Sequence, residues 1–195
     1  RMEKKSDVII IGAGLAGITI AIRLSELGIN SILVEAGNKN KDNRFQDSYS
    51  GTAEKMHLAS GLKFSRNRMF GGTSNTWGGG CAELDEEDFI QREWIQDSGW
   101  PINKKELSEF YNQASSFMGI NISRIQNPSI TGMPDIDELE LKNLEYSQVK
   151  NFNKRFYDEI NNNSKINLIE EYSVCKFNRD SYSSKINNII AKNIK

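Results

Sequence analysis

Two glycine-rich segments in the first half of the chain carry residue types that could do chemistry. The first is Gly12-Ala13-Gly14-Leu15-Ala16-Gly17, which matches the pattern GxGxxG and directly follows a β-branched run at residues 7–11. In this position Gly12 allows a tight turn, Gly14 lets the backbone approach a pyrophosphate, and Gly17 lets the next helix lie close to the strand. Free N–H groups at the start of that helix attract phosphate. The segment therefore predicts a dinucleotide site.

An acidic residue narrows the choice of nucleotide. Glu35 ends a second predicted strand, residues 31–35, and stands 18 residues after Gly17. A carboxylate at this place accepts hydrogen bonds from a ribose diol and repels a 2′-phosphate. An ordinary strand-to-helix turn followed by a solvated acid is the alternative, and it accounts for fewer of these features. We expect FAD or NAD.

The second glycine segment, residues 68–80, is the most specific stretch of the sequence. Its five glycines flank hydroxyl, amide and indole side chains, so its backbone can wrap closely around a flat polar ligand. A nicotinamide-dependent dehydrogenase needs no such loop at this place. The segment favours FAD over NAD.

At this point the chain resembles the glucose-methanol-choline (GMC) family of FAD-dependent oxidoreductases, which carry a Gly-Gly-Ser/Thr-Ser/Thr loop beside the flavin. The resemblance continues through Asp88-Phe89, Arg92, residues 98–102 and residues 106–111, and more faintly to Val174. Many members have Asn where this chain has Trp77. The Trp-Gly-Gly version looks more like the branches that oxidise sugars and polyols.

The resemblance implies the cofactor contacts residue by residue. The implied contacts are Gly12, Gly14, Leu15 and Gly17 for the pyrophosphate, Glu35, Ala36 and Val174 for the adenosine, Gly72, Thr73, Trp77, Gly78 and Gly80 for the flavin, and Arg68 near the phosphates. Some sugar oxidases of the family tether the flavin through a His just before the tryptophan. The matching residue here is Thr76, a poor nucleophile, so the resemblance implies non-covalent FAD.

The sequence lacks an evident catalytic base. Oxidation of an alcohol by a flavin needs a base that takes the hydroxyl proton while hydride leaves for the flavin, and His is the usual choice near neutral pH. The only His is His57, in the polar stretch at residues 38–66, where we interpret it as a surface residue. The family supplies its His from its C-terminal part. The chain therefore reads as the N-terminal portion of an enzyme that transfers hydride from a CH–OH group of a sugar or polyol to FAD, with catalytic residues and electron acceptor unassigned.

Two other functions fit part of the sequence. Another flavoprotein with two dinucleotide-binding motifs, such as a galactopyranose mutase, shares the opening glycine pattern, but residues 71–80 followed by residues 98–102 argue against it. The other alternative is a non-catalytic nucleotide-binding module, which would need no catalytic base.

The elements that must position these residues predict an α/β fold. Strands at residues 7–11 and 31–35 flank a helix at residues 15–27, as in a parallel sheet covered on both faces. Asn103 and Glu106 form a capping box before a helix that reaches Met118. Further predicted elements are a helix at about residues 147–161 and strands at residues 166–169, 172–177 and 186–190, the last three beginning a β-meander.

The domain prediction follows from where the glycines lie. Residues 1–120 form the FAD-binding portion with its flavin loop, residues 121–165 part of a substrate domain, and residues 166–195 the start of the meander, which returns to the FAD domain. The expected fold is thus an incomplete Rossmann-like FAD-binding fold with the start of a substrate domain.

Composition and charge exclude several classes of protein. The 25 Lys and Arg residues and 26 Asp and Glu residues give a net charge of −1, which leaves no basic excess for nucleic acid. The longest uncharged apolar run, residues 8–22, is shorter than the roughly 20 residues of a membrane span. Cys81 and Cys175 alone make no disulfide framework, and the acids at residues 85–88 read as a solvated helix start rather than a metal site. We expect a cytoplasmic protein whose partner is a small-molecule substrate.

Overall fold

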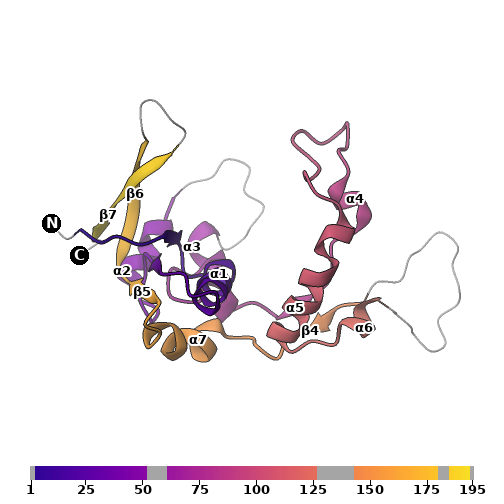
Figure 1. Cartoon of the computed structure of the whole chain (residues 1–195), viewed down its shortest axis with the longest axis horizontal. Coiled ribbons are helices and arrows are strands. Elements are labelled where there is room, and N and C mark those ends of the chain that lie inside the picture. Colours follow the sequence, from indigo (N-terminus) through magenta and orange to yellow (C-terminus); the bar gives the residue numbers. More distant parts are fainter. Residues whose placement is uncertain (1–2, 52–60, 127–142, 180–184, 194–195) are drawn as a thin grey trace, which may run out of the picture. The chain divides into compact units, whose positions relative to one another are not determined.

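The computed structural model describes residues 3–51, 61–126, 143–179 and 185–193. The chain divides into two compact units (Figure 1). Unit 1 comprises Arg1–Trp77 and Asn151–Lys195, and unit 2 comprises Gly78–Lys150. The predicted domains, divided at residues 120 and 165, stay a prediction.

Unit 1 is built on a parallel sheet, as predicted. Its strands are β1 (Val8–Ile11), β2 (Ser31–Val34) and β5 (Ile166–Ile169), in the order β1-β2-β5. Both strand pairs are parallel, with Ile10 opposite Leu33 and Leu33 opposite Leu168. Helix α1 (Leu15–Glu26) contacts all three strands and also contacts α7 (Phe152–Asn161).

The prediction that residues 166–169 open a meander is wrong. A parallel neighbour of β2 needs a crossover connection, and α7 provides it, burying Phe152, Phe156 and Ile160. Strand β5 therefore enters the sheet parallel to β2. The antiparallel part is the hairpin of β6 (Tyr172–Arg179) and β7 (Ile186–Asn193). Helix α7 also begins later than predicted, because the Asn151 side chain caps it by accepting from the Lys154 N–H at 2.9 Å.

The two central strands differ in how well they are covered. All four residues of β2 are buried. Strand β1 lies at the end of the sheet order, and its alternate residues Ile9 and Ile11 are 38% and 50% exposed while Ile10 is buried. The prediction that β1 is covered on both faces is therefore wrong for the described residues, where only one side of this strand is buried.

The predicted polar excursion at residues 38–66 holds short helices. These are α2 (Asn43–Gln46), η1 (Asp47–Tyr49) and α3 (Gly61–Ser65). Helix α2 forms because Asp42 accepts from the Arg44 N–H at 2.9 Å and Phe45 is buried in the core. His57 lies outside the described residues.

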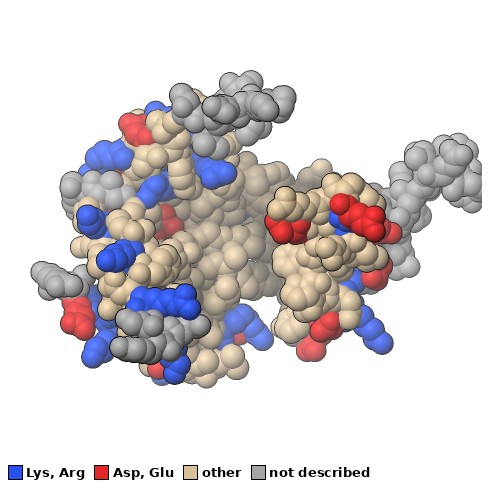
Figure 2. Space-filling model, turned by 90° about the horizontal axis from the view of Figure 1, so that it is seen from above, with Lys and Arg blue, Asp and Glu red and all other residues tan. Residues whose placement is uncertain are grey.

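Unit 2 combines helices with one short strand pair in its described residues. It contains β3 (Gly80–Cys81) paired antiparallel with β4 (Glu145–Tyr146), and the helices α4 (Glu86–Phe89), η3 (Lys104–Leu107), α5 (Ser108–Met118) and α6 (Ile122–Gln126). The predicted capping box is confirmed, since Asn103 N–H donates to Glu106 at 2.9 Å and Glu106 N–H donates to Asn103 at 3.1 Å. The predicted acidic helix start is also present in α4, and acidic side chains are visible on unit 2 in Figure 2.

Helix α5 buries less of its apolar face than its spacing predicts. Met118 is buried, but Phe110 is 59% exposed. No helix in the described parts of either unit is long and apolar enough to cross a membrane.

Candidate dinucleotide site

The turn between β1 and α1 leaves open space where the sequence predicts a pyrophosphate. Gly12 has a φ of 93° and donates its N–H to the Val34 carbonyl at 2.7 Å. A Cβ atom added at Gly12 or Gly14 would meet no atom within 4 Å, whereas one at Gly17 would lie 2.0 Å from the Gly12 carbonyl oxygen. The fold therefore requires a glycine at residue 17, whereas the space next to Gly14 is open.

The start of α1 suits an anion. Gly14 is the N-cap residue, no side chain of the described chain caps the helix there, and its first turn has no acidic residue. The first N–H groups of α1 therefore have no side-chain acceptor at the positive end of the helix dipole. This combination of free donors and open space fits a pyrophosphate.

Glu35 connects two turns at the carboxyl ends of the strands. Its Oε2 accepts from the Ala13 N–H at 2.9 Å, and its Oε1 accepts from the Gly37 N–H at 2.7 Å. Burial raises the pKa of Glu35, while these two hydrogen bonds and the charge of Arg68 lower it. Each carboxylate oxygen can accept a second hydrogen bond. Glu35 thus holds the glycine turn and keeps acceptor capacity for a ribose.

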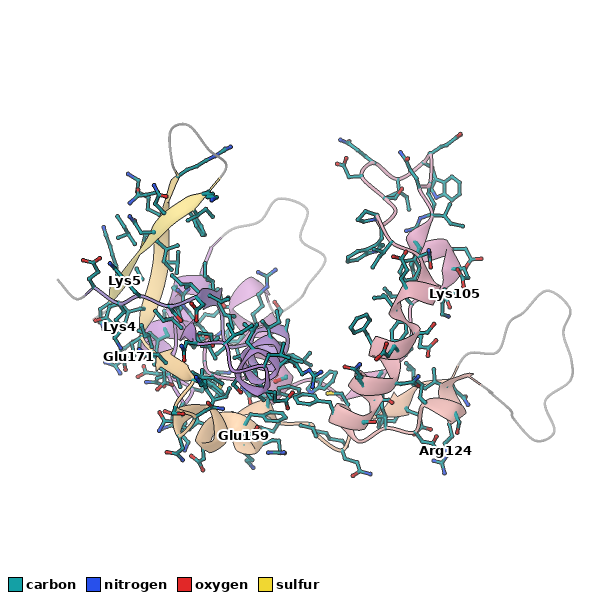
Figure 3. The ribbon with its side chains drawn as sticks, in the orientation of Figure 1. Lys4, Lys5, Lys105, Arg124, Glu159 and Glu171 are labelled. Atoms are coloured by element: carbon teal, nitrogen blue, oxygen red, sulfur yellow. The ribbon has the colours of Figure 1, made fainter. Side chains whose placement is uncertain are left out.

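The connection after β5 is held against the residues that follow Glu35. Glu171, labelled in Figure 3, has a φ of 67° and donates its N–H to the Gly37 carbonyl at 2.8 Å. Its carboxylate accepts from the Asn38 amide at 3.2 Å. These contacts bring β6, and with it Val174, to the carboxyl end of β2.

The guanidinium group of Arg68 contacts β6. One terminal nitrogen donates to the Ser48 hydroxyl at 2.6 Å and the other donates to the hydroxyl of Ser173, the neighbour of Val174. Its Nε is buried without a partner among the described residues. These contacts hold Arg68 next to Val174, which the resemblance implies for the adenosine.

The second glycine segment contacts the first. Gly71 N–H donates to the Ala13 carbonyl at 2.7 Å, and a Cβ atom at Gly72 would lie 3.4 Å from Gly14 Cα. Gly71 and Gly72 have φ values of 85° and 54°, in the region that favours glycine. The short helix η2 (Gly72–Asn75) follows. The structure therefore brings the two predicted loops together.

Most predicted cofactor residues lie in unit 1. These are Gly12, Gly14, Leu15, Gly17, Glu35, Ala36, Arg68, Gly72, Thr73, Trp77 and Val174. Thr73 and Trp77 are linked by the Trp77 N–H, which donates to the Thr73 carbonyl at 3.1 Å. Gly78 and Gly80 belong to unit 2, where Gly80 lies in β3.

Sequence reasoning missed the backbone groups that organise the site. Ala13 and Gly37 donate to Glu35, and Gly71 donates to Ala13. A Cβ atom at Gly37 would lie 2.2 Å from the Arg68 carbonyl oxygen. The glycine two residues after the acid was a signal that could have been read, because such close approach of two backbones needs a residue without a side chain.

A tyrosine and a second acid, also missed, fasten α7 to the sheet. Tyr157 donates its hydroxyl to Glu170 Oε2 at 2.8 Å, just after β5. Burial, followed by this hydrogen bond and the Glu170 charge, raises the pKa of Tyr157 to about 12. The Tyr157 ring also meets Phe70 edge to face, with ring centroids 5.0 Å apart. Helix α7 is thereby packed against the residue that precedes Gly71.

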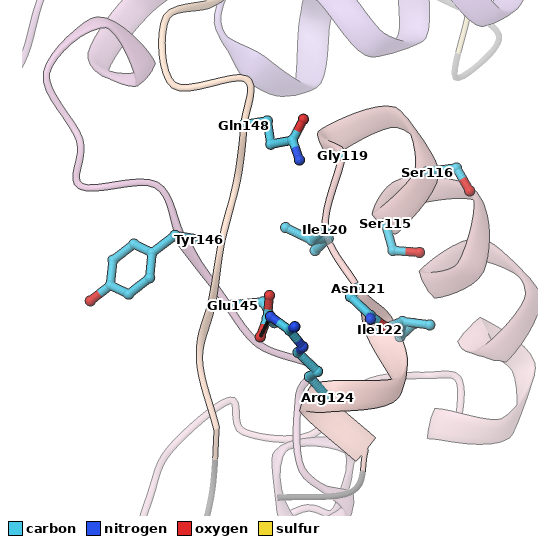
Figure 4. A pocket seen from close by; sticks show the side chains of 10 residues that line it. All are labelled: Ser115, Ser116, Gly119, Ile120, Asn121, Ile122, Arg124, Glu145, Tyr146 and Gln148. Atoms are coloured by element: carbon cyan, nitrogen blue, oxygen red, sulfur yellow. Dashed lines mark ion pairs between the residues drawn. The ribbon is translucent and has the colours of Figure 1, made fainter.

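Unit 2 has a polar pocket of about 570 Å³ where α5, α6 and β4 meet (Figure 4). Across it, Arg124 and Glu145 form an ion pair with a distance of 3.8 Å. None of the predicted cofactor residues lines this pocket. No group of three or more His, Cys, Asp or Glu side chains within the described ranges could hold a metal ion.

Comparisons with known proteins agree with the geometry. A family model described as an FAD binding domain matches residues 7–45, which span β1, the glycine turn, α1, β2 and Glu35. Cholesterol oxidase from Mycobacterium tuberculosis is 25% identical over 143 residues, covering 67% of this chain and 24% of the oxidase. The chain therefore spans about a quarter of the length of this curated relative.

Solved structures share the fold. A fungal aryl-alcohol oxidase gives a TM-score of 0.55 at 13% identity, covering 99% of this chain and 43% of that one. Pyridoxine 4-oxidase from Mesorbium loti gives a TM-score of 0.54 at 15% identity, covering 97% of this chain and 46% of that one. The family match, the open glycine turn and the buried Glu35 together show that the chain carries part of an FAD-binding domain of the kind found in FAD-dependent oxidoreductases.

Proposed function

We propose that the chain is the N-terminal, FAD-binding portion of a GMC-type oxidoreductase that transfers hydride from a CH–OH group to flavin. The observation that carries the proposal is the contact between the two glycine segments, Gly71 with Ala13 and Gly72 with Gly14. A dinucleotide turn alone fits many proteins, whereas a second glycine loop seated on it suits a flavin. The cholesterol oxidase relative, named for an alcohol, supports a CH–OH donor.

The residues of unit 1 would divide the work of holding the cofactor. The start of α1 and the turn at Gly12 and Gly14 would bind the pyrophosphate, and Glu35 would accept hydrogen bonds from the ribose. Arg68 would lie at the adenosine end, where its buried Nε lacks a partner within the described chain. When bound, FAD supplies the hydride acceptor. The proton acceptor is proposed to come from a part of the protein beyond this chain.

A sugar or polyol is the proposed substrate, because Trp77-Gly78-Gly79 follows the pattern of the sugar-oxidising branches. The test is an anaerobic titration of the protein in its natural full length. We expect a flavin absorbance spectrum that is bleached by a sugar or polyol. Bleaching only by cholesterol or an aryl alcohol would contradict the substrate class, and a colourless protein that binds NAD would contradict the whole proposal.

The flavin is proposed to be held without a covalent bond. Thr76, at the position of the tethering His, has its hydroxyl engaged, since it accepts from the Asn67 amide at 2.7 Å and donates to the Thr73 carbonyl at 3.3 Å. Acid precipitation should therefore release the yellow colour into the supernatant. A yellow pellet whose flavin peptide maps to residues 68–81 would show a covalent link.

A further inference from the structure

We infer that Asn75 is a positioning residue that fixes the flavin loop to the start of α7. The inference rests on the proposed function, because it takes Gly71 and Gly72 as the loop beside the flavin. Neither Asn75 nor α7 belongs to the GxGxxG turn, so the two halves of the cofactor would depend on different parts of unit 1.

The Asn75 side chain uses both its donor and its acceptor groups. Its Nδ2 donates to the Phe70 carbonyl at 2.8 Å and to the Gly72 carbonyl at 2.9 Å. Its Oδ1 accepts from the Asn153 backbone N–H at 3.3 Å. The amide therefore bridges the carbonyls on either side of Gly71 and a residue 78 positions later in the chain.

Asn75 also fills the space above Gly71. A Cβ atom at Gly71 would lie 2.8 Å from Asn75 Nδ2 and 2.9 Å from the Asn153 nitrogen. A side chain at residue 71 would therefore displace the Asn75 amide or the start of α7. Because Gly71 N–H donates to Ala13, this arrangement sets how the second loop sits on the glycine turn.

The partner of Asn75 is itself firmly held. Asn153 lies in the first turn of α7, where backbone N–H groups have no acceptor within the helix. Its own side chain donates to the Lys39 carbonyl, and the neighbouring Phe152 is fully buried. Asn75 is therefore tied to a fixed point in the core of unit 1 rather than to another loop.

This arrangement predicts that the two halves of FAD respond differently to a change at residue 75. The turn at Gly12–Gly14 is held by Glu35 and by the Gly12 hydrogen bond to Val34, and neither of these involves Asn75, so ADP binding should change little when Asn75 is replaced. The position of Gly72 depends more strongly on Asn75, because the Gly72 carbonyl accepts from the Asn75 amide. Loss of the Asn75 contacts should therefore weaken FAD binding much more than ADP binding.

The experiment compares the affinities of ADP and FAD for the apoprotein by calorimetric titration. Asn75→Ala should weaken FAD binding about tenfold, equivalent to about 1.4 kcal/mol, and change ADP binding less than about twofold. Asn75→Asp should weaken FAD binding more than Asn75→Ala, because its carboxylate faces the carbonyl oxygens of Phe70 and Gly72. A substitution that merely removed packing would show the reverse order. Asn161→Ala, at an exposed residue of the same helix α7, is the matched control.

A second measurement tests the position of the ring itself. At saturating FAD, the visible circular dichroism of the flavin should change in Asn75→Ala and stay unchanged in Asn161→Ala. Equal FAD affinity in Asn75→Ala and wild type would overturn the inference, as would equal losses of ADP and FAD binding or an Asn75→Asp variant that binds FAD like wild type. If wild-type protein bound FAD no more tightly than ADP, the proposed function would be contradicted instead.

Discussion

The side chain of Glu35 accepts a hydrogen bond from the backbone N–H of Ala13 at 2.9 Å, so the acid that follows β2 holds the glycine turn that follows β1. The same carboxylate accepts from Gly37 at 2.7 Å. A change at Glu35 therefore alters the shape of the pyrophosphate turn as well as any contact with a ribose.

Substitution of two glycines should separate binding from folding. Gly14→Val should abolish FAD binding while the apoprotein keeps its stability, because no atom lies within 4 Å of a Cβ at Gly14. Gly17→Val should prevent folding, because its Cβ would lie 2.0 Å from the Gly12 carbonyl oxygen. Urea unfolding and flavin content of both variants check the prediction. An unfolded Gly14→Val protein would show that protein atoms, and not the cofactor, occupy the space next to Gly14.

Replacing Glu35 by Gln should weaken FAD binding about tenfold. The amide keeps one oxygen acceptor, but its NH₂ group then faces the N–H of either Ala13 or Gly37, which leaves a buried donor unpaired. Fluorescence titration with FAD is the measurement. Glu26→Gln, which removes only the exposed ion pair with Arg23, is the control and should match wild type.

The same carboxylate should make the stability of the apoprotein depend on pH. Burial raises the pKa of Glu35 above its ordinary value of 4.5, so the unfolded state ionises first as the pH rises. Protonated Glu35 therefore contributes stability below 4.5 that is lost as the pH rises through the folded-state pKa. Urea unfolding from about pH 4 to about pH 8 should show wild type losing stability relative to Glu35→Gln. If the free energies of unfolding of the two proteins changed in parallel with pH, the raised pKa of Glu35 would be contradicted.

Tyr157→Phe should destabilise the protein by about 1–2 kcal/mol at neutral pH, because Glu170 loses its donor. The other oxygen of Glu170 is already buried without a partner in the described chain. The pKa of Tyr157 is raised from 10 to about 12, so the stability that the neutral hydroxyl provides is lost as the pH rises through that window. Urea unfolding at alkaline pH should therefore bring wild type toward Tyr157→Phe. Tyr146→Phe, at an exposed residue, should follow wild type throughout.

The sequence by itself determined the parts of the site that neighbouring residues build. The turn at Gly12, the helix from Leu15 and the position of Glu35 follow from glycine spacing and from the alternation of strand and helix. The capping box of Asn103 and Glu106 is equally local, because each residue pairs with a backbone group three positions away. Such features need no knowledge of distant contacts, and the structure shows them where they were predicted.

Only the tertiary structure decided which distant segments meet. The sequence of residues 166–169 suits any buried strand, and its place parallel to β2 depends on the crossover through α7. The exposure of Ile9 and Ile11 reflects what packs on β1, which a run of isoleucines does not reveal. The contacts of Arg68 with Ser173 and of Asn75 with Asn153 join residues 105 and 78 positions apart. Long flexible side chains and loop amides find such partners only after the core has fixed the backbones that carry them.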